Sequence, residues 1–179
     1  MIVLLLGWMS VAWQFPFSIF NFNKTMTYDA DDIVIKQYQQ DVEAFKDYFE
    51  SHSKDEDVTT NWTPYILEAY ERSWLLEKGP IDISHQDLDH MLFDLQSMRQ
   101  TVMDLAFRGD EYGLQTKDYL NMVLTSILNI EDDIRRLKHS RWHSRKTLNR
   151  QIGNLQNSMM TNFDNYATFY KAFKEIDSQ

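Results

Sequence analysis

The chain contains no cysteine, only three prolines and five glycines, and fewer basic than acidic side chains. The absence of cysteine excludes disulfides, a thiolate nucleophile, and zinc or iron–sulfur sites built on cysteine. So few glycines and prolines argue against an all-β fold, which uses both in its turns. The net charge of −9 argues against nucleic-acid binding, which needs excess positive charge. What remains, 179 residues with 43% hydrophobic and 14% aromatic side chains, is typical of one folded domain.

Residues 1–23 contain no charged side chain, and the first is Lys24. As a helix rising about 1.5 Å per residue, this run reaches about 35 Å, against roughly 30 Å for the hydrocarbon core of a bilayer. We therefore predict a single membrane-spanning helix over residues 1–23, kept as an anchor, and a short linker over residues 24–29. Two alternatives remain. The first is a cleaved signal peptide, because residues 10–12 have the small-x-small form of a cleavage site. The second is a buried N-terminal segment, because Pro16 would break or kink a membrane-spanning helix.

The predicted anchor implies a single-pass protein of the cell membrane. Its orientation is only weakly determined, because no Lys or Arg precedes the apolar run and only Lys24 and Lys36 closely follow it. The absence of cysteine favours export, so we expect residues 30–179 to form an extracytoplasmic domain.

Apolar side chains recur at helical spacing nearly everywhere after residue 30, and no alternation typical of a β-strand is found. A polar loop is expected over residues 51–60. The first predicted helix covers residues 30–52. The second has Thr63 as its N-cap and Pro64 at its first position, and it ends at Gly79; the third begins at a capping box at Ser84 and ends at Gly109. The last two run from about Thr116 to Leu137 and from Leu148 to Phe173.

The last two predicted helices carry heptad-like apolar seams. Short polar breaks between amphipathic helices indicate an all-α fold, in which an antiparallel bundle of four to five helices forms one domain over residues 30–179. No Gly or Pro lies between Leu137 and Leu148, so the last two helices could also be continuous over about 60 residues. A hairpin is favoured, because Arg141 is a poor core residue and Ser140 or Ser144 can serve as an N-cap.

No pattern in the chain carries a recognisable chemistry. A Gly-rich phosphate loop and a Ser/His/Asp signature are both missing. Paired acids fall in predicted loops or polar helix faces, without the burial that catalytic carboxylates need. His85 and Asp89 have the i,i+4 spacing of a helical metal chelate, but they lie in a first turn that is expected to face solvent. We therefore predict no enzyme, no metal site and no cofactor.

One segment stands out by its charge. Residues 135–150 contain seven cations and no acid, which leaves −16 for the rest of the chain. This segment is either a solvated helix end or a surface that contacts anionic lipid or an acidic partner. The predicted contact residues are Arg135, Arg136, Lys138, Arg141, Trp142, Arg145, Lys146 and Arg150.

Two functions follow as hypotheses. The first is a membrane-anchored, non-enzymatic helical bundle that acts as an interaction or scaffold protein, with a protein partner or a second copy bound through the helical seams. If its helices alternate in direction, the connection between the last two returns to the membrane and brings the basic segment with it. The alternative is an extracytoplasmic ligand-sensing bundle, which requires a polar pocket between helices.

Overall fold

A computed structural model describes residues 13–19, 21, 24–53, 57–108 and 112–177. Helices dominate these residues, as the all-α prediction requires, but a two-stranded sheet accompanies them. The elements, in chain order, are β1 (Thr25–Asp29), α2 (Asp32–His52), α3 (Val58–Tyr70), α4 (Ser73–Leu76), β2 (Pro80–Ser84), α5 (His85–Phe107), α6 (Leu114–Lys138) and α7 (Arg145–Asp177).

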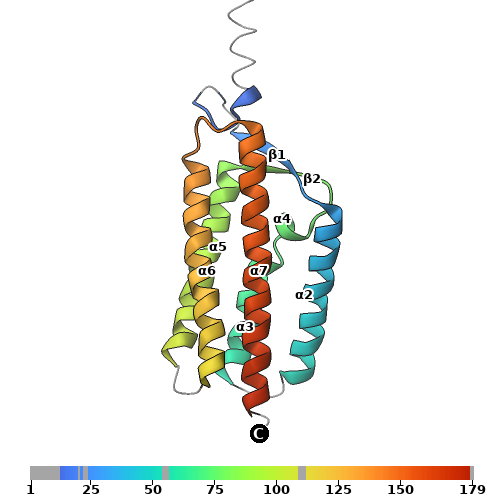
Figure 1. The fold of residues 1–179 in the computed structure, drawn as a ribbon, viewed down its shortest axis with the longest axis vertical. Coiled ribbons are helices and arrows are strands. Elements are labelled where there is room, and N and C mark those ends of the chain that lie inside the picture. The colour runs from blue at the N-terminus through green and yellow to red at the C-terminus, as the bar shows by residue number, and fades with distance from the viewer. Residues whose placement is uncertain (1–12, 20, 22–23, 54–56, 109–111, 178–179) are drawn as a thin grey trace, which may run out of the picture.

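The long helices α2, α5, α6 and α7 run lengthwise through an elongated bundle (Figure 1). The sheet, the start of α5, the connection between α6 and α7 and residues 13–19 lie together at one end, at the top of Figure 1. We call this the upper end. The C-terminus and the connections α2–α3 and α5–α6 lie at the opposite, lower end. The alternating helix directions predicted from the sequence are therefore confirmed.

The expectation that the chain has no strand is wrong. Strand β1 lies within the predicted linker and pairs antiparallel with β2, from Thr25 opposite Ser84 to Asp29 opposite Pro80. Met26 and Tyr28 are buried while their neighbours face outward, which is the two-residue alternation of a half-buried strand. Five residues are too few for this alternation to stand out against the helical spacing that follows.

The second predicted helix is placed wrongly at both of its ends. Helix α3 begins at Val58, because the carboxylate of Asp57 accepts a hydrogen bond of 2.6 Å from the Thr60 backbone N–H. Pro64 therefore lies inside the helix. The helix ends at Tyr70, well before Gly79, whose φ of 80° instead makes the turn into β2.

Two other sequence signals are confirmed. Ser84 and Asp87 form the predicted capping box at the start of α5, with both reciprocal hydrogen bonds present. The last two helices form a hairpin, since α6 ends at Lys138 and α7 begins at Arg145. Ser144 caps α7, because its Oγ accepts from the backbone N–H of Thr147 at 3.3 Å.

The core is continuous along the bundle and richest in aromatic rings on the lower half of α7. Phe45 of α2 makes edge-to-face contacts with Phe163 and Tyr170, at 5.7 Å between ring centroids in each case. Buried tyrosine hydroxyls are satisfied across helices: Tyr166 shares a hydrogen bond of 2.8 Å with Thr63 of α3. The apolar seams thus pack inside the chain, with specific polar contacts between them.

The predicted membrane-spanning helix is not found among the described residues, where no helix is long and apolar enough to cross a bilayer. Residues 1–12, 20, 22 and 23 of that prediction lie outside the described part. Residues 15–19 do not continue a helix: the chain turns at Pro16, as its ring and missing N–H would require. Pro16, Phe17 and Ser18 are buried against the bundle.

Shortening buried side chains between α6 and α7 should lower the stability of the bundle. Ile127 and Leu155 are almost fully buried, so Ile127→Ala and Leu155→Ala should each lower the free energy of unfolding by about 2–5 kcal/mol. Leu128→Ala is the matched control, because that side chain is 46% exposed and its loss should cost below ~0.5 kcal/mol. Chemical denaturation measures all three, and equal effects would show that the seam does not carry the core.

The ion pair between Asp57 and Lys174, 2.6 Å apart, should make the free energy of unfolding depend on pH. Burial raises the pKa of Asp57, but hydrogen bonds from Lys174 and Thr60 outweigh it and hold the pKa below its ordinary value. The charge therefore stabilises the fold above an unfolded-state pKa of about 3.9, and this contribution is lost as pH falls through the lower folded-state value.

Asp57→Asn isolates this charge, because asparagine is also a good N-cap. The variant should be less stable than the wild type at pH 7, and the difference should shrink below about pH 4. Denaturation curves between pH 7 and pH 3 measure the difference, and a difference independent of pH would contradict the assignment.

Candidate functional site

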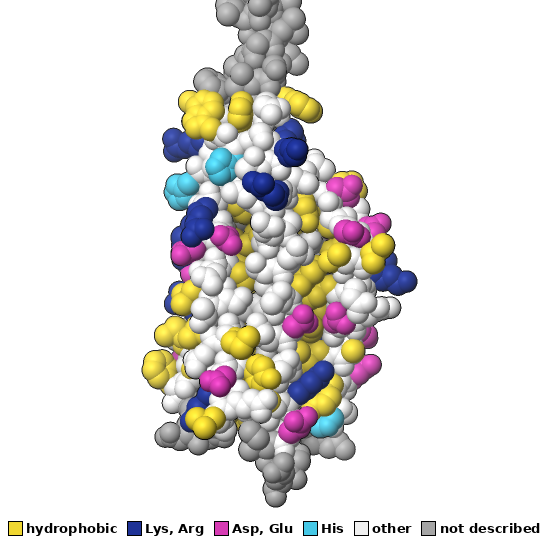
Figure 2. Space-filling view, in the orientation of Figure 1, with side chains coloured by type: hydrophobic (Ala, Val, Ile, Leu, Met, Phe, Trp, Pro, Cys, Tyr) yellow, Lys and Arg dark blue, Asp and Glu magenta, His cyan; other side chains and the backbone are white. Residues whose placement is uncertain are grey.

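The predicted contact residues gather at the upper end of the bundle, but they divide into two groups. Lys and Arg side chains cluster near the N-terminal segment on the face shown in Figure 2, while Asp and Glu lie mainly lower down. The last turn of α6 holds Arg135, Arg136 and Lys138. The connection and the first turns of α7 hold Arg141, Trp142, Arg145, Lys146 and Arg150.

The cations of α6 are already balanced within the chain. Arg135 bonds Glu131 at 2.6 Å and Asp132 at 2.7 Å, and Arg136 lies 3.4 Å from Asp133. Lys138 is paired with Asp89 at the start of α5. These three predicted contact residues therefore form ion pairs within the bundle.

The second group keeps its positive charge. Arg141, Lys146 and Arg150 are exposed, and no carboxylate of the described residues pairs with them. Arg145 contacts the N-terminal segment: its Nε donates to the Trp13 carbonyl at 2.5 Å, and its guanidinium lies 5.5 Å from the centre of the Trp13 ring. We call Arg141, Arg145, Lys146 and Arg150 the basic end.

No acid of the described residues forms an ion pair with the basic end, and most of the nearby acids accept hydrogen bonds from other groups. Asp31 accepts from the N–H of Ile33 and Asp87 from that of Ser84, so each caps a helix. Asp32 accepts from the N–H of Gly79, and Asp82 from the hydroxyl of Thr27. Asp89, at the start of α5, forms an ion pair with Lys138 instead.

Aromatic side chains surround the basic end. Trp13 and Trp142 are both more than half exposed, and Phe15 packs edge-on against Trp142 with 6.0 Å between ring centroids. Phe17 is fully buried and holds the segment to the bundle through an edge-on contact with His85. The upper end therefore presents fixed cations beside exposed indole rings, the combination favoured where a protein meets a bilayer surface.

The environment of His85 lowers its pKa, mainly through burial. Burial, and then the charges of Lys24 and Lys138, hold the pKa of His85 below its ordinary value. The suggested i,i+4 partner, Asp89, is engaged by Lys138. In the described part of the chain, no group of three or more His, Asp or Glu side chains is placed to hold a metal ion.

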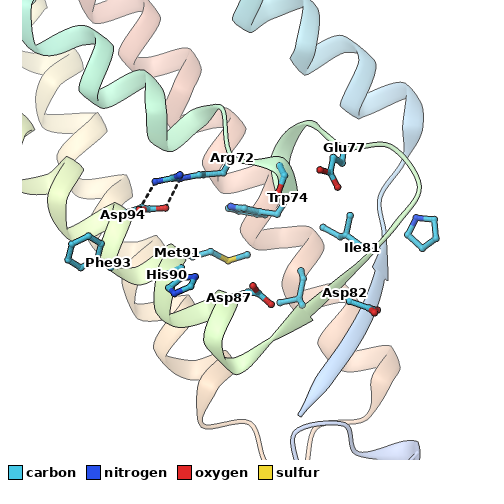
Figure 3. A pocket seen from close by; sticks show the side chains of 13 residues that line it. Arg72, Trp74, Glu77, Ile81, Asp82, Asp87, His90, Met91, Phe93 and Asp94 are labelled. Carbon is cyan, nitrogen blue, oxygen red and sulfur yellow. Dashed lines mark hydrogen bonds and ion pairs between the residues drawn. The ribbon is translucent and has the colours of Figure 1, made fainter. Parts of the chain in front are cut away.

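Sequence reasoning missed a concave feature on the side of the bundle. A cleft of about 610 Å³ opens between α4, β2 and the first half of α5 (Figure 3). Its residues all lie between positions 72 and 94, where the chain folds back on itself through α4, β2 and the start of α5. The sequence pattern predicted one helix over residues 64–79, so the short α4 and the strand β2 that shape the cleft were not expected. The side chains labelled around it come from the three elements and the loops between them: Arg72, Trp74, Glu77, Ile81, Asp82, Asp87, His90, Met91, Phe93 and Asp94.

Neutralising a buried acid of α6 should destabilise the fold more than neutralising an exposed one. The side chain of Glu131 is 2% exposed and accepts from Arg99 at 2.7 Å and from Arg135 at 2.6 Å. Glu131→Gln leaves Arg99 without its anion and Arg135 with Asp132 alone, and should cost about 2 kcal/mol. Asp133→Asn removes an exposed pair and should cost below ~0.5 kcal/mol. Thermal or chemical denaturation compares them, and similar losses would mean that burial of Glu131 is unimportant.

Comparisons with known proteins add no assignment. No family model, no curated protein and no solved structure matches the chain. The function must therefore be inferred from the upper end and the cleft themselves.

Proposed function

We propose that this chain is a membrane-anchored, non-enzymatic helical bundle that lays its basic end on an anionic bilayer surface and acts as an interaction or scaffold protein. The observation that carries the proposal is the contact of Trp13 and Phe15 with Arg145 and Trp142. The apolar N-terminal run enters the bundle beside cations that have no acidic partner in the described residues. A membrane that holds this run would face the basic end.

The anchor is proposed in a shorter form than the sequence predicts. Because the chain turns at Pro16, a helix that enters the bilayer would end at about residue 14. At about 1.5 Å per residue it would reach about 21 Å, which enters the hydrocarbon core of roughly 30 Å without crossing it. The exposed Trp13 and Trp142 would then lie at the interface, where indole rings have favourable surroundings. The cell membrane, with an extracytoplasmic bundle, remains the proposed location.

The expected attraction is moderate and depends on salt. Each Lys or Arg close to an anionic leaflet contributes about 1 kcal/mol, so the four residues of the basic end contribute about 4 kcal/mol. The attraction weakens beyond a Debye length of about 10 Å at 0.1 M salt. It therefore orients a bundle that another segment holds at the membrane.

A protein partner would contact the bundle away from the heptad seams. Those seams are buried between α6 and α7 and are not available to a second chain. Phe107 and Leu114, both highly exposed, lie at the lower end of the bundle, facing away from the proposed membrane surface. We propose this end for a protein partner or a second copy.

The ligand-sensing alternative is favoured by a different observation. It requires a polar pocket between helices, and the cleft between α4 and α5, with β2 as a further wall, supports this alternative. Both functions can hold together, because the cleft and the basic end share no residue.

Liposome flotation tests the surface contact. Residues 13–179 should float with vesicles that contain phosphatidylserine and not with phosphatidylcholine alone, because attraction requires negative lipid. Binding should fall as salt rises from about 0.1 to 1 M, where the Debye length shrinks to about 3 Å. The triple variant Arg141→Gln, Lys146→Gln, Arg150→Gln should lose most of the binding.

The control removes the same charge at the lower end. Arg108→Gln, Lys117→Gln, Lys171→Gln should bind as well as the wild type, since these residues belong to the opposite ends of α5, α6 and α7. Equal loss of vesicle binding in both triple variants would mean that binding depends only on the net charge of the protein. Equal binding by the wild type and the first variant would contradict the proposal.

A further inference from the structure

The cleft beside α4 is large enough for a small organic molecule. Its volume of about 610 Å³ lies within the range of ligand pockets, roughly 300–1,000 Å³. The pairing of β1 with β2 shapes one wall, and α5 forms the other. The opposed walls thus come from β2 and α5, which follow each other directly in the chain.

The charges that line the cleft are predominantly negative. Glu77, Asp82, Asp87 and Asp94 contribute carboxylates, whereas Arg72 contributes the one fixed cation in the lining. Arg72 is committed to Asp94, with Nε 2.8 Å from Oδ2 and Nη2 2.9 Å from Oδ1. That ion pair, with one hydrogen bond from Nη2, cancels one carboxylate of the cleft.

The remaining carboxylates differ in how far they are engaged. Asp87 accepts from the backbone and hydroxyl of Ser84, and Asp82 accepts from Thr27. Glu77 is exposed at the end of α4, and no side-chain hydrogen bond or ion pair to it is found within the described region. The cleft thus keeps a surplus of negative charge that a bound cation would neutralise.

Apolar and aromatic surfaces complete the lining. The indole of Trp74 lies across the cleft in Figure 3, with Met91 beside it and Ile81 opposite. Phe93 at the rim is 68% exposed. An aromatic face attracts a cation through its quadrupole, and the thioether and aliphatic groups suit an apolar body.

We propose that this cleft binds an organic cation: an ammonium group attached to an apolar body. The surplus of carboxylates selects the charge, Trp74 and Phe93 favour a weakly hydrated ammonium, and the apolar wall takes the rest of the molecule. A bare metal ion fits poorly, because the described side chains gather no three-ligand group here. This binding goes beyond the proposed membrane contact and uses none of its residues.

Three probes that share a phenyl ring and differ in charge test the proposal. Benzyltrimethylammonium, benzyl alcohol and benzoate are titrated by ligand-observed NMR onto the full chain in a nonionic detergent. The cation should bind with saturable affinity at least about fivefold above that of the neutral alcohol, the ratio expected from one cation–π contact. Benzoate should not bind.

Matched variants place the binding in the cleft. Glu77→Gln with Asp82→Asn should weaken cation binding about fivefold or more, and Phe93→Ala, at an exposed position, should weaken it without loss of the fold. Glu43→Gln with Asp47→Asn removes the same charge from exposed positions of α2 and should leave affinity unchanged. Circular dichroism confirms that each variant is folded.

Several outcomes would overturn the proposal. Equal binding of the cation and the alcohol would mean that only the apolar wall acts. Equal weakening by both acid pairs would mean that the cation answers to net charge alone. Absence of saturable cation binding, or preference for benzoate, would also refute it. None of these results bears on flotation, so the two proposals fail separately.

Discussion

The antiparallel pairing of β1 with β2 is the constraint on which the upper end of this molecule depends. Five residue pairs, from Thr25–Ser84 to Asp29–Pro80, hold the N-terminal segment beside the start of α5. Tyr28 of the same strand donates to Gln156 of α7 at 2.9 Å, so the sheet is also fixed to the last helix. Through these contacts the apolar segment meets the α6–α7 connection, and β2 forms a wall of the cleft.

The distribution of charge then decides what each surface can do. Carboxylates near the upper end cap helices or bind backbone N–H groups, and acids of α5 and α6 neutralise the cations of α6. The start of α7 has no such acids, and its cations remain available beside Trp13 and Trp142. On the side of the bundle the excess is reversed, since Arg72 is spent on Asp94 while other carboxylates face the cleft. One chain thus offers an anionic surface to cations and a cationic end to anions.

Sequence patterns predicted the parts of the fold that local signals determine. The capping box at Ser84 and the buried stripes through Ile127 of α6 and Leu155 of α7 follow from local patterns, and Ser144 is one of the two caps that the sequence offered for α7. The sheet escaped prediction, because five-residue strands gain their stability from a partner 55 residues away. Pro64 misled for a related reason: a better cap, Asp57, lies seven residues earlier and is supported by Lys174 at the far end of the chain. The cleft was missed because residues 64–79 were predicted as one helix, whereas α3 ends at Tyr70 and the short α4 and β2 follow it.

The orientation of the full chain in a bilayer tests the central claim most directly. The chain has no cysteine, so His139→Cys at the upper end and Ser51→Cys at the lower end each give a unique site for a nitroxide label. The two ends are separated by the length of α2, about 30 Å for its 21 residues. In anionic vesicles whose lipid headgroups carry chelated gadolinium, the label at position 139 should relax much faster than the label at position 51. Equal relaxation at both positions, or faster relaxation at position 51, would contradict a bundle that rests on the membrane through its basic end.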